Sequence, residues 1–118
     1  MGSRWADLVV DAVDPPRLAQ WWASVLDYRL LYESSDEATI GADEDSRPTI
    51  TFIHVSDAKS GKNRLHLDLS PDDRDAEVER LVNMGARRVD VGQPDDAAWS
   101  VLADPEGNEF CVLRAKAG

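Results

Sequence analysis

The same order of structural elements occurs twice along this chain, and this repeat limits the available folds more than any other feature. In each half, a segment of alternating apolar and polar residues is followed by an aspartate and an amphipathic segment. Asp14 and Asp73 occupy the expected helix N-caps and are separated by half of the 118 residues. One half would expose an apolar sheet face that it cannot bury alone, so we expect the two halves to pair in one domain.

Periodicity assigns the elements of each half, because strands alternate with period two and helices place apolar residues three and four positions apart. The expected elements are a strand at 5–12, a helix after Asp14, strands at 29–33, 38–42 and 49–55, a strand at 65–70, a helix that ends at Gly85, and strands at 87–91, 98–103 and 109–114. Trp21 and Trp22 lie on the apolar helix stripe, which predicts core packing.

These elements define an α+β fold of two tandem βαβββ modules. We expect a single domain over residues 1–118, with a first module over about 5–56, a linker over about 57–64 and a second module over about 65–115. The linker is polar and contains three of the thirteen basic residues. It could bind an anion, but a solvated connection is the simpler interpretation.

The composition excludes several classes of partner. The formal net charge is −10, from 23 acidic and 13 basic residues, which argues against nucleic acid because phosphates require clustered Lys and Arg. No apolar run approaches the ~20 residues that a membrane-spanning helix needs. The single cysteine, Cys111, cannot form an internal disulfide, and this agrees with the cytoplasmic location that we expect.

Three motifs carry a resemblance to a known family. They are the run Asp14–Leu18 that leads into the tryptophan pair, the run His66–Leu69 that follows Gly61–Arg64, and the turn Asp104–Asn108 before the last strand. Together with the repeat, they resemble the glyoxalase and bleomycin-resistance (vicinal oxygen chelate) family and its glyoxalase-like subgroup. Asp27 departs from the family, which usually has glycine there. The resemblance implies a cupped, mostly antiparallel half-barrel with helices outside, a ligand cavity inside, and a homodimer.

The resemblance also implies four metal-ligand positions, on the first and last strands of each module. In this chain they correspond to Asp7, Thr51, His66 and Cys111, and only His66 is the family's usual residue. A divalent metal of this kind needs about three good protein ligands. We therefore favour no metal cofactor, while zinc, iron, manganese, nickel or magnesium at these positions stays an alternative.

Strand alternation sorts the remaining candidates by face. The helix-facing set is Leu8, Val10, Leu65, Leu67, Phe110 and Val112, and the predicted ligand-binding set on the opposite face is Asp7, Val9, Asp68, Trp99, Val101 and Glu109. An acidic face that also carries a tryptophan suits a small polar or cationic organic ligand. Cys111 shares this face, but neighbouring Glu109 would disfavour its thiolate, so we discount it as a nucleophile.

His66 is the candidate catalytic residue. Paired with its module-related residue, Asp7, it could act as a general base, although we favour a purely structural contact between the modules as the explanation of the pair. The sequence therefore predicts a ligand-binding protein without the family's full metal site. The alternative is a metal-dependent lyase, isomerase or dioxygenase that uses His66 as metal ligand or base, and whether the chain is an enzyme stays open. An accessory domain in an assembly is a third interpretation.

Overall fold

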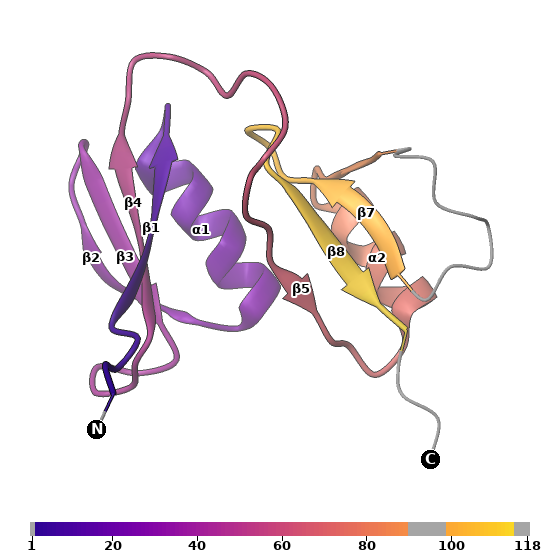
Figure 1. Cartoon of the computed structure of the whole chain (residues 1–118), viewed down its shortest axis with the longest axis horizontal. Coiled ribbons are helices and arrows are strands. Elements are labelled where there is room, and N and C mark those ends of the chain that lie inside the picture. Colours follow the sequence, from indigo (N-terminus) through magenta and orange to yellow (C-terminus); the bar gives the residue numbers. More distant parts are fainter. Residues whose placement is uncertain (1, 90–98, 115–118) are drawn as a thin grey trace. The chain divides into compact units, whose positions relative to one another are not determined.

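The computed structural model describes residues 2–89 and 99–114 and contains two compact units, Met1–Ala58 and Lys59–Gly118. Each unit holds one four-stranded sheet and one helix (Figure 1). Both sheets are open and mixed, with one parallel and two antiparallel strand pairs each. The predicted α+β fold of two tandem βαβββ modules is therefore confirmed.

The first unit follows the predicted element order closely. Its elements are β1 (Asp7–Ala12), α1 (Pro15–Leu26), β2 (Arg29–Glu33), β3 (Glu37–Gly41) and β4 (Thr49–His54). The strand order is β1-β4-β3-β2, with β1 parallel to β4. Helix α1 packs on this sheet, and its stripe of Leu18, Ala19, Trp22 and Val25 is buried. Trp21 meets Trp22 edge to face, with ring centroids 5.0 Å apart.

The ends of α1 follow from local chemistry. The Asp14 side chain accepts a hydrogen bond from the backbone N–H of Arg17 at 3.3 Å, and proline occupies the first helical position. At the other end, Asp27 adopts a left-handed conformation with φ of 56°. A residue without Cβ fits that conformation best, which explains why a glycine is usual there in the family that the chain resembles.

The second unit repeats the same order with shorter strands. Its elements are β5 (Asp68–Leu69), α2 (Arg74–Asn83), β6 (Arg87–Arg88), β7 (Trp99–Ala103) and β8 (Glu109–Leu113). The strand order β5-β8-β7-β6 matches that of the first sheet, and β5 is parallel to β8. Asp73 caps α2 by accepting from the Ala76 N–H at 3.1 Å, and Val78 and Leu81 are the buried residues of this helix.

The prediction of a strand at 65–70 is largely wrong, because β5 begins only at Asp68. Its first ladder bond runs from the Cys111 N–H to the Leu67 carbonyl at 2.9 Å, so the residues before Leu67 are outside the parallel pairing. Leu65 is consequently 82% exposed instead of packing beneath α2. Phe110 and Val112, on the long strand β8, are buried as expected. The ends of the strands expected at 87–91 and 98–103 lie partly outside the described residues.

Neither of the two described helices has the length and apolar character needed to cross a bilayer.

Candidate functional site

A pocket of about 410 Å³ lies within the second unit. This is within the range of about 300–1,000 Å³ that small-molecule sites usually have. Six of the residues that the sequence singled out line it: His66, Asp68, Trp99, Val101, Glu109 and Cys111. The residues that sequence reasoning missed are Lys62, Asn63, Phe110 and Leu113.

The register of three adjacent strands gathers these side chains on one face. Asp68 of β5 pairs with Cys111 of β8, which in turn pairs with Val101 of β7. Trp99 of β7 pairs with Leu113 of β8, two residues along each strand from the pair of Val101 and Cys111. Since side chains alternate between the faces of a sheet, residues two apart on each strand point to the same side. The pocket therefore has a titratable end and an apolar wall that contains an indole ring.

The titratable end consists of His66, Asp68 and Cys111. His66 Nε2 lies 3.2 Å from Asp68 Oδ1, and both side chains are about half exposed. One donor atom of each of the three residues lies within 4.8 Å of those of the other two. Burial and then the charge of Asp68 and its hydrogen bond raise the pKa of the Cys111 thiol. The thiol form is thus favoured, and the responsible carboxylate is Asp68 rather than Glu109.

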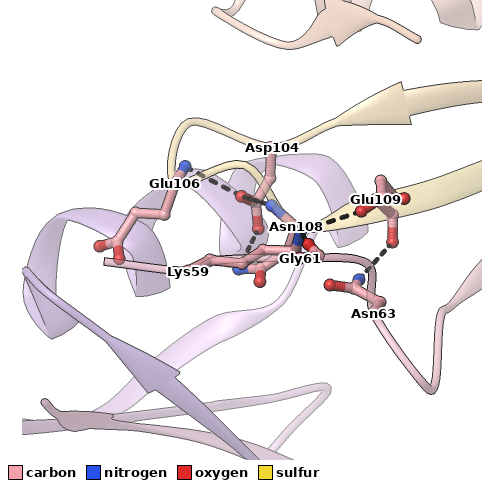
Figure 2. Close-up of polar contacts among 7 residues, drawn as sticks. All are labelled: Lys59, Gly61, Asn63, Asp104, Glu106, Asn108 and Glu109. Carbon is pink, nitrogen blue, oxygen red and sulfur yellow. Dashed lines mark hydrogen bonds and ion pairs between the residues drawn. The ribbon is translucent and has the colours of Figure 1, made fainter. Parts of the chain in front are cut away.

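Glu109, which also lines the pocket, is held by the segment that we expected to be a solvated connection. Lys59 Nζ lies 3.0 Å from Glu109 Oε1, and Lys59 also donates to the carbonyl of Gly61 (Figure 2). Asn63 Nδ2 donates to the Glu109 carbonyl at 3.0 Å. The hydrogen bond from Lys59 is the main cause that lowers the pKa of Glu109. The segment is therefore attached to β8, and the charge of Glu109 is already balanced.

The turn Asp104–Asn108 fixes where β8 begins. Asp104 is only 2% exposed, and its Oδ1 accepts from the backbone N–H groups of Glu106 and Asn108 at 2.9 Å each (Figure 2). Its Oδ2 accepts from Asn108 Nδ2 at 3.1 Å, and Gly107 has a φ of 90°. A short acceptor at the first position and a glycine near the end are what such a turn requires. The turn thereby sets the position of Glu109.

In the first unit, the predicted site residue Asp7 is hydrogen-bonded to threonines of β4. Asp7 Oδ1 accepts from the hydroxyls of Thr49 at 2.8 Å and Thr51 at 3.2 Å. Thr51 Oγ1 also lies 3.0 Å from Thr39 Oγ1, so Thr39 donates to it when Thr51 donates to Asp7. Val9 pairs with Thr51 across β1 and β4 and is 54% exposed. Sequence reasoning missed Thr49, although it lies next to Asp7 in the register.

The four positions of the family's metal site are thus divided between the units. Asp7 and Thr51 belong to the first, where the Thr51 hydroxyl donates a hydrogen bond to Asp7 Oδ1. His66 and Cys111 belong to the second, where Asp68 joins them. A threonine hydroxyl is not among the usual protein ligands of the divalent metals concerned. The residues present do not fit the four-position site.

Two βαβββ modules with the same strand order, the second of which holds a ligand-sized pocket, define a protein of the glyoxalase fold. Residues 7–113 match the family model of the glyoxalase-like domain, and the chain belongs to this family. A comparison with curated proteins gave no match.

Solved structures support the fold over the whole chain. A glyoxalase/bleomycin resistance protein/dioxygenase family enzyme from Burkholderia phytofirmans PsJN has a TM-score of 0.75 at 16% identity and covers 97% of this chain and 100% of its own. The fosfomycin resistance protein FosX from Mesorhizobium loti has a TM-score of 0.67 at 16% identity, with 98% and 94% covered.

A third similar structure is the bleomycin-binding protein from Streptomyces verticillus in complex with copper(II)-bleomycin. Its TM-score is 0.61 at 16% identity, with 98% of this chain and 99% of that chain covered. At this identity the likeness extends to the fold alone, and the ligand must be argued from the residues of this chain.

Proposed function

We propose that this protein binds a small polar or cationic organic ligand in the pocket of the second module, without the family's four-position metal site. The observation that carries the proposal is the common location of Asp68, Trp99, Val101 and Glu109. Alternation alone assigned these four to a ligand-binding face, and all four line one pocket of about 410 Å³. We infer that Asp7 and Val9, in the first module, also belong to the ligand-binding face.

The side chains of the pocket favour a particular ligand chemistry. Trp99 is 40% exposed and lies beside Val101 and Leu113, so it offers an aromatic surface on which a flat apolar group can stack. Because Lys59 balances Glu109, the carboxylate that stays open to solvent is that of Asp68. We infer that a cationic group of the ligand binds near Asp68 while its apolar part covers Trp99.

One of the similar solved structures is compatible with the proposal of a small-molecule ligand. The structure from Streptomyces verticillus is a bleomycin-binding protein in complex with copper(II)-bleomycin, so that protein of the same fold holds a small molecule. Its name does not give the ligand of the present chain, because one scaffold supports many functions.

A calorimetric screen tests the proposal. A panel of cationic, aromatic small molecules is titrated into the wild-type chain in the presence of a chelator, and any hit is repeated with Trp99→Ala. Loss of a stacked indole is expected to cost about 1–2 kcal/mol, a weakening of Kd by roughly 5- to 30-fold. Trp5→Ala is the matched control, since Trp5 is exposed in the first unit. Uniform failure of the panel, or equal effects of the two variants, would contradict the proposal.

A metal-dependent lyase, isomerase or dioxygenase is the second candidate, with His66 as metal ligand or general base. The observation that favours it is the 3.2 Å contact between His66 and Asp68, since a carboxylate can orient an imidazole for proton transfer. Ligands from the screen are incubated with the protein, with and without added divalent metal, and followed by mass spectrometry. Conversion that His66→Ala abolishes, with ligand binding retained, supports an enzyme. Binding without conversion supports a binding protein.

We further propose that the chain folds as one cytoplasmic domain over residues 1–118 and assembles as a homodimer. Sheet edges in each unit and the single free thiol of Cys111 are compatible with this proposal. Native mass spectrometry gives the number of chains, and a single cooperative unfolding transition would support one domain.

A further inference from the structure

We propose that His66, Asp68 and Cys111 form a divalent-metal site of the zinc class that lies entirely within the second module. This site is distinct from the four-position site that spans both modules in the family's metal-binding members. It goes beyond the organic-ligand proposal and does not depend on it.

The geometry of the three donors suits a shared ion. Their donor atoms lie within 4.8 Å of one another. Zinc bonds to nitrogen, oxygen and sulfur ligands are about 2.0–2.3 Å long, which puts neighbouring donors of a tetrahedron roughly 3.3–3.8 Å apart. The cluster thus needs to contract by up to about 1.5 Å. His66 and Asp68 can supply this movement, because their side chains are about half exposed while Cys111 is fixed on β8.

The chemistry of the donors selects the metal. One imidazole nitrogen, one carboxylate oxygen and one cysteine sulfur are typical zinc ligands, and three of them leave a fourth position open to a small molecule. Sulfur disfavours magnesium, calcium and manganese, which prefer oxygen ligands. We therefore expect zinc, cobalt or nickel and not the harder metals. Because the three residues line the pocket, a small molecule in the pocket would be near the open position.

The equivalent positions of the first module do not carry the same three donors. Asp7 and Thr51 occupy the positions related to His66 and Cys111. The Thr51 hydroxyl donates a hydrogen bond of 3.2 Å to Asp7 Oδ1. Asp68, by comparison, has Val9 at its related position in the strand register. The donor set is complete only in the second module, where a carboxylate replaces an apolar side chain.

Cobalt(II) and zinc titrations of the reduced, chelator-treated protein test the site. We expect one equivalent of cobalt, with the near-ultraviolet absorption that a thiolate-to-cobalt bond produces, and displacement by zinc. Cys111→Ser should remove that absorption, and His66→Ala or Asp68→Asn should each weaken binding by at least about 10-fold. Asp11→Asn, at an exposed acidic residue of the first module, is the matched control and should leave the affinity unchanged. Circular dichroism checks that each variant is folded.

Several outcomes would overturn the inference. They are no stoichiometric binding to folded protein, a cobalt spectrum without the thiolate absorption, or magnesium bound as tightly as zinc. Equal losses in Asp7→Asn and His66→Ala would assign the metal to the family's shared site instead. Failure here is separable from failure of the organic-ligand proposal, because the calorimetric screen contains a chelator.

Discussion

Replacing Asp104 with alanine is expected to lower the free energy of unfolding by about 3–5 kcal/mol. The carboxylate accepts three hydrogen bonds, two from backbone N–H groups and one from the Asn108 amide. A hydrogen bond to a charged acceptor contributes about 1.5–3 kcal/mol, and the lower figure is appropriate because water can partly replace a lost acceptor in a turn. Since small domains are stable by about 5–15 kcal/mol, this is a large share of the total.

Asparagine at the same position should cost less, about 1–2 kcal/mol. Its side-chain oxygen can still accept from the backbone N–H groups of Glu106 and Asn108, but its amide nitrogen would face the amide of Asn108, donor against donor. Urea denaturation followed by circular dichroism measures both variants, with Asp72→Ala as a control at an exposed acidic residue. A loss below about 1 kcal/mol for Asp104→Ala would refute the reasoning, as would equal losses for alanine and asparagine.

Three further predictions concern charge and backbone conformation. Because Lys59 lowers the pKa of Glu109, their ion pair stabilises the fold above the ordinary carboxyl pKa, and this stabilisation is lost as the pH falls through the lowered value. Urea denaturation over a pH series should show a shallower acid loss in Glu109→Gln, and identical profiles would contradict the assignment. The raised pKa of Cys111 predicts slow alkylation by iodoacetamide at neutral pH, which mass spectrometry should show to be faster in Asp68→Asn. Asp27→Gly should stabilise the chain by up to about 1 kcal/mol in thermal unfolding, because φ at this residue is 56°, and a lower Tm would count against this.

The features that could be predicted from sequence are those that a few neighbouring residues determine. Asp14 and Asp73 cap their helices because an aspartate side chain reaches the N–H three residues later. Asp104 organises its turn in the same way. No distant residue needs to be known for either interaction, so the sequence pattern alone was sufficient.

The start of β5 shows where local patterns fail. Leu65, Leu67 and Leu69 alternate as a strand should, yet the parallel pairing begins only at Leu67. Alternation reports which face a residue would take in a strand, but the length of the strand depends on its partner β8, far away in sequence. Leu65 was therefore assigned to the core and is instead exposed.

The charge pairs of the site could not be predicted from the sequence, because they too depend on contacts that local patterns do not reveal. Glu109 was counted as an open acid, but Lys59 reaches it from the segment that precedes the second module. The pair that the sequence suggested for His66 was Asp7, and it did not single out the contact that the His66 imidazole makes with Asp68, two positions away. Strand alternation predicts which residues share a face of the sheet, while the pairs on that face depend on side-chain conformations and strand register.

The two modules share a backbone plan, but the side chains at equivalent positions differ in chemistry. The same parallel register joins Val9 to Thr51 in the first sheet and Asp68 to Cys111 in the second. In the first, two threonine hydroxyls donate to Oδ1 of the Asp7 carboxylate, and these hydrogen bonds join β1 to β4. In the second, the equivalent side chains are titratable and line a pocket. Because the backbone is equivalent, the binding that we propose for the second module rests on these side-chain differences.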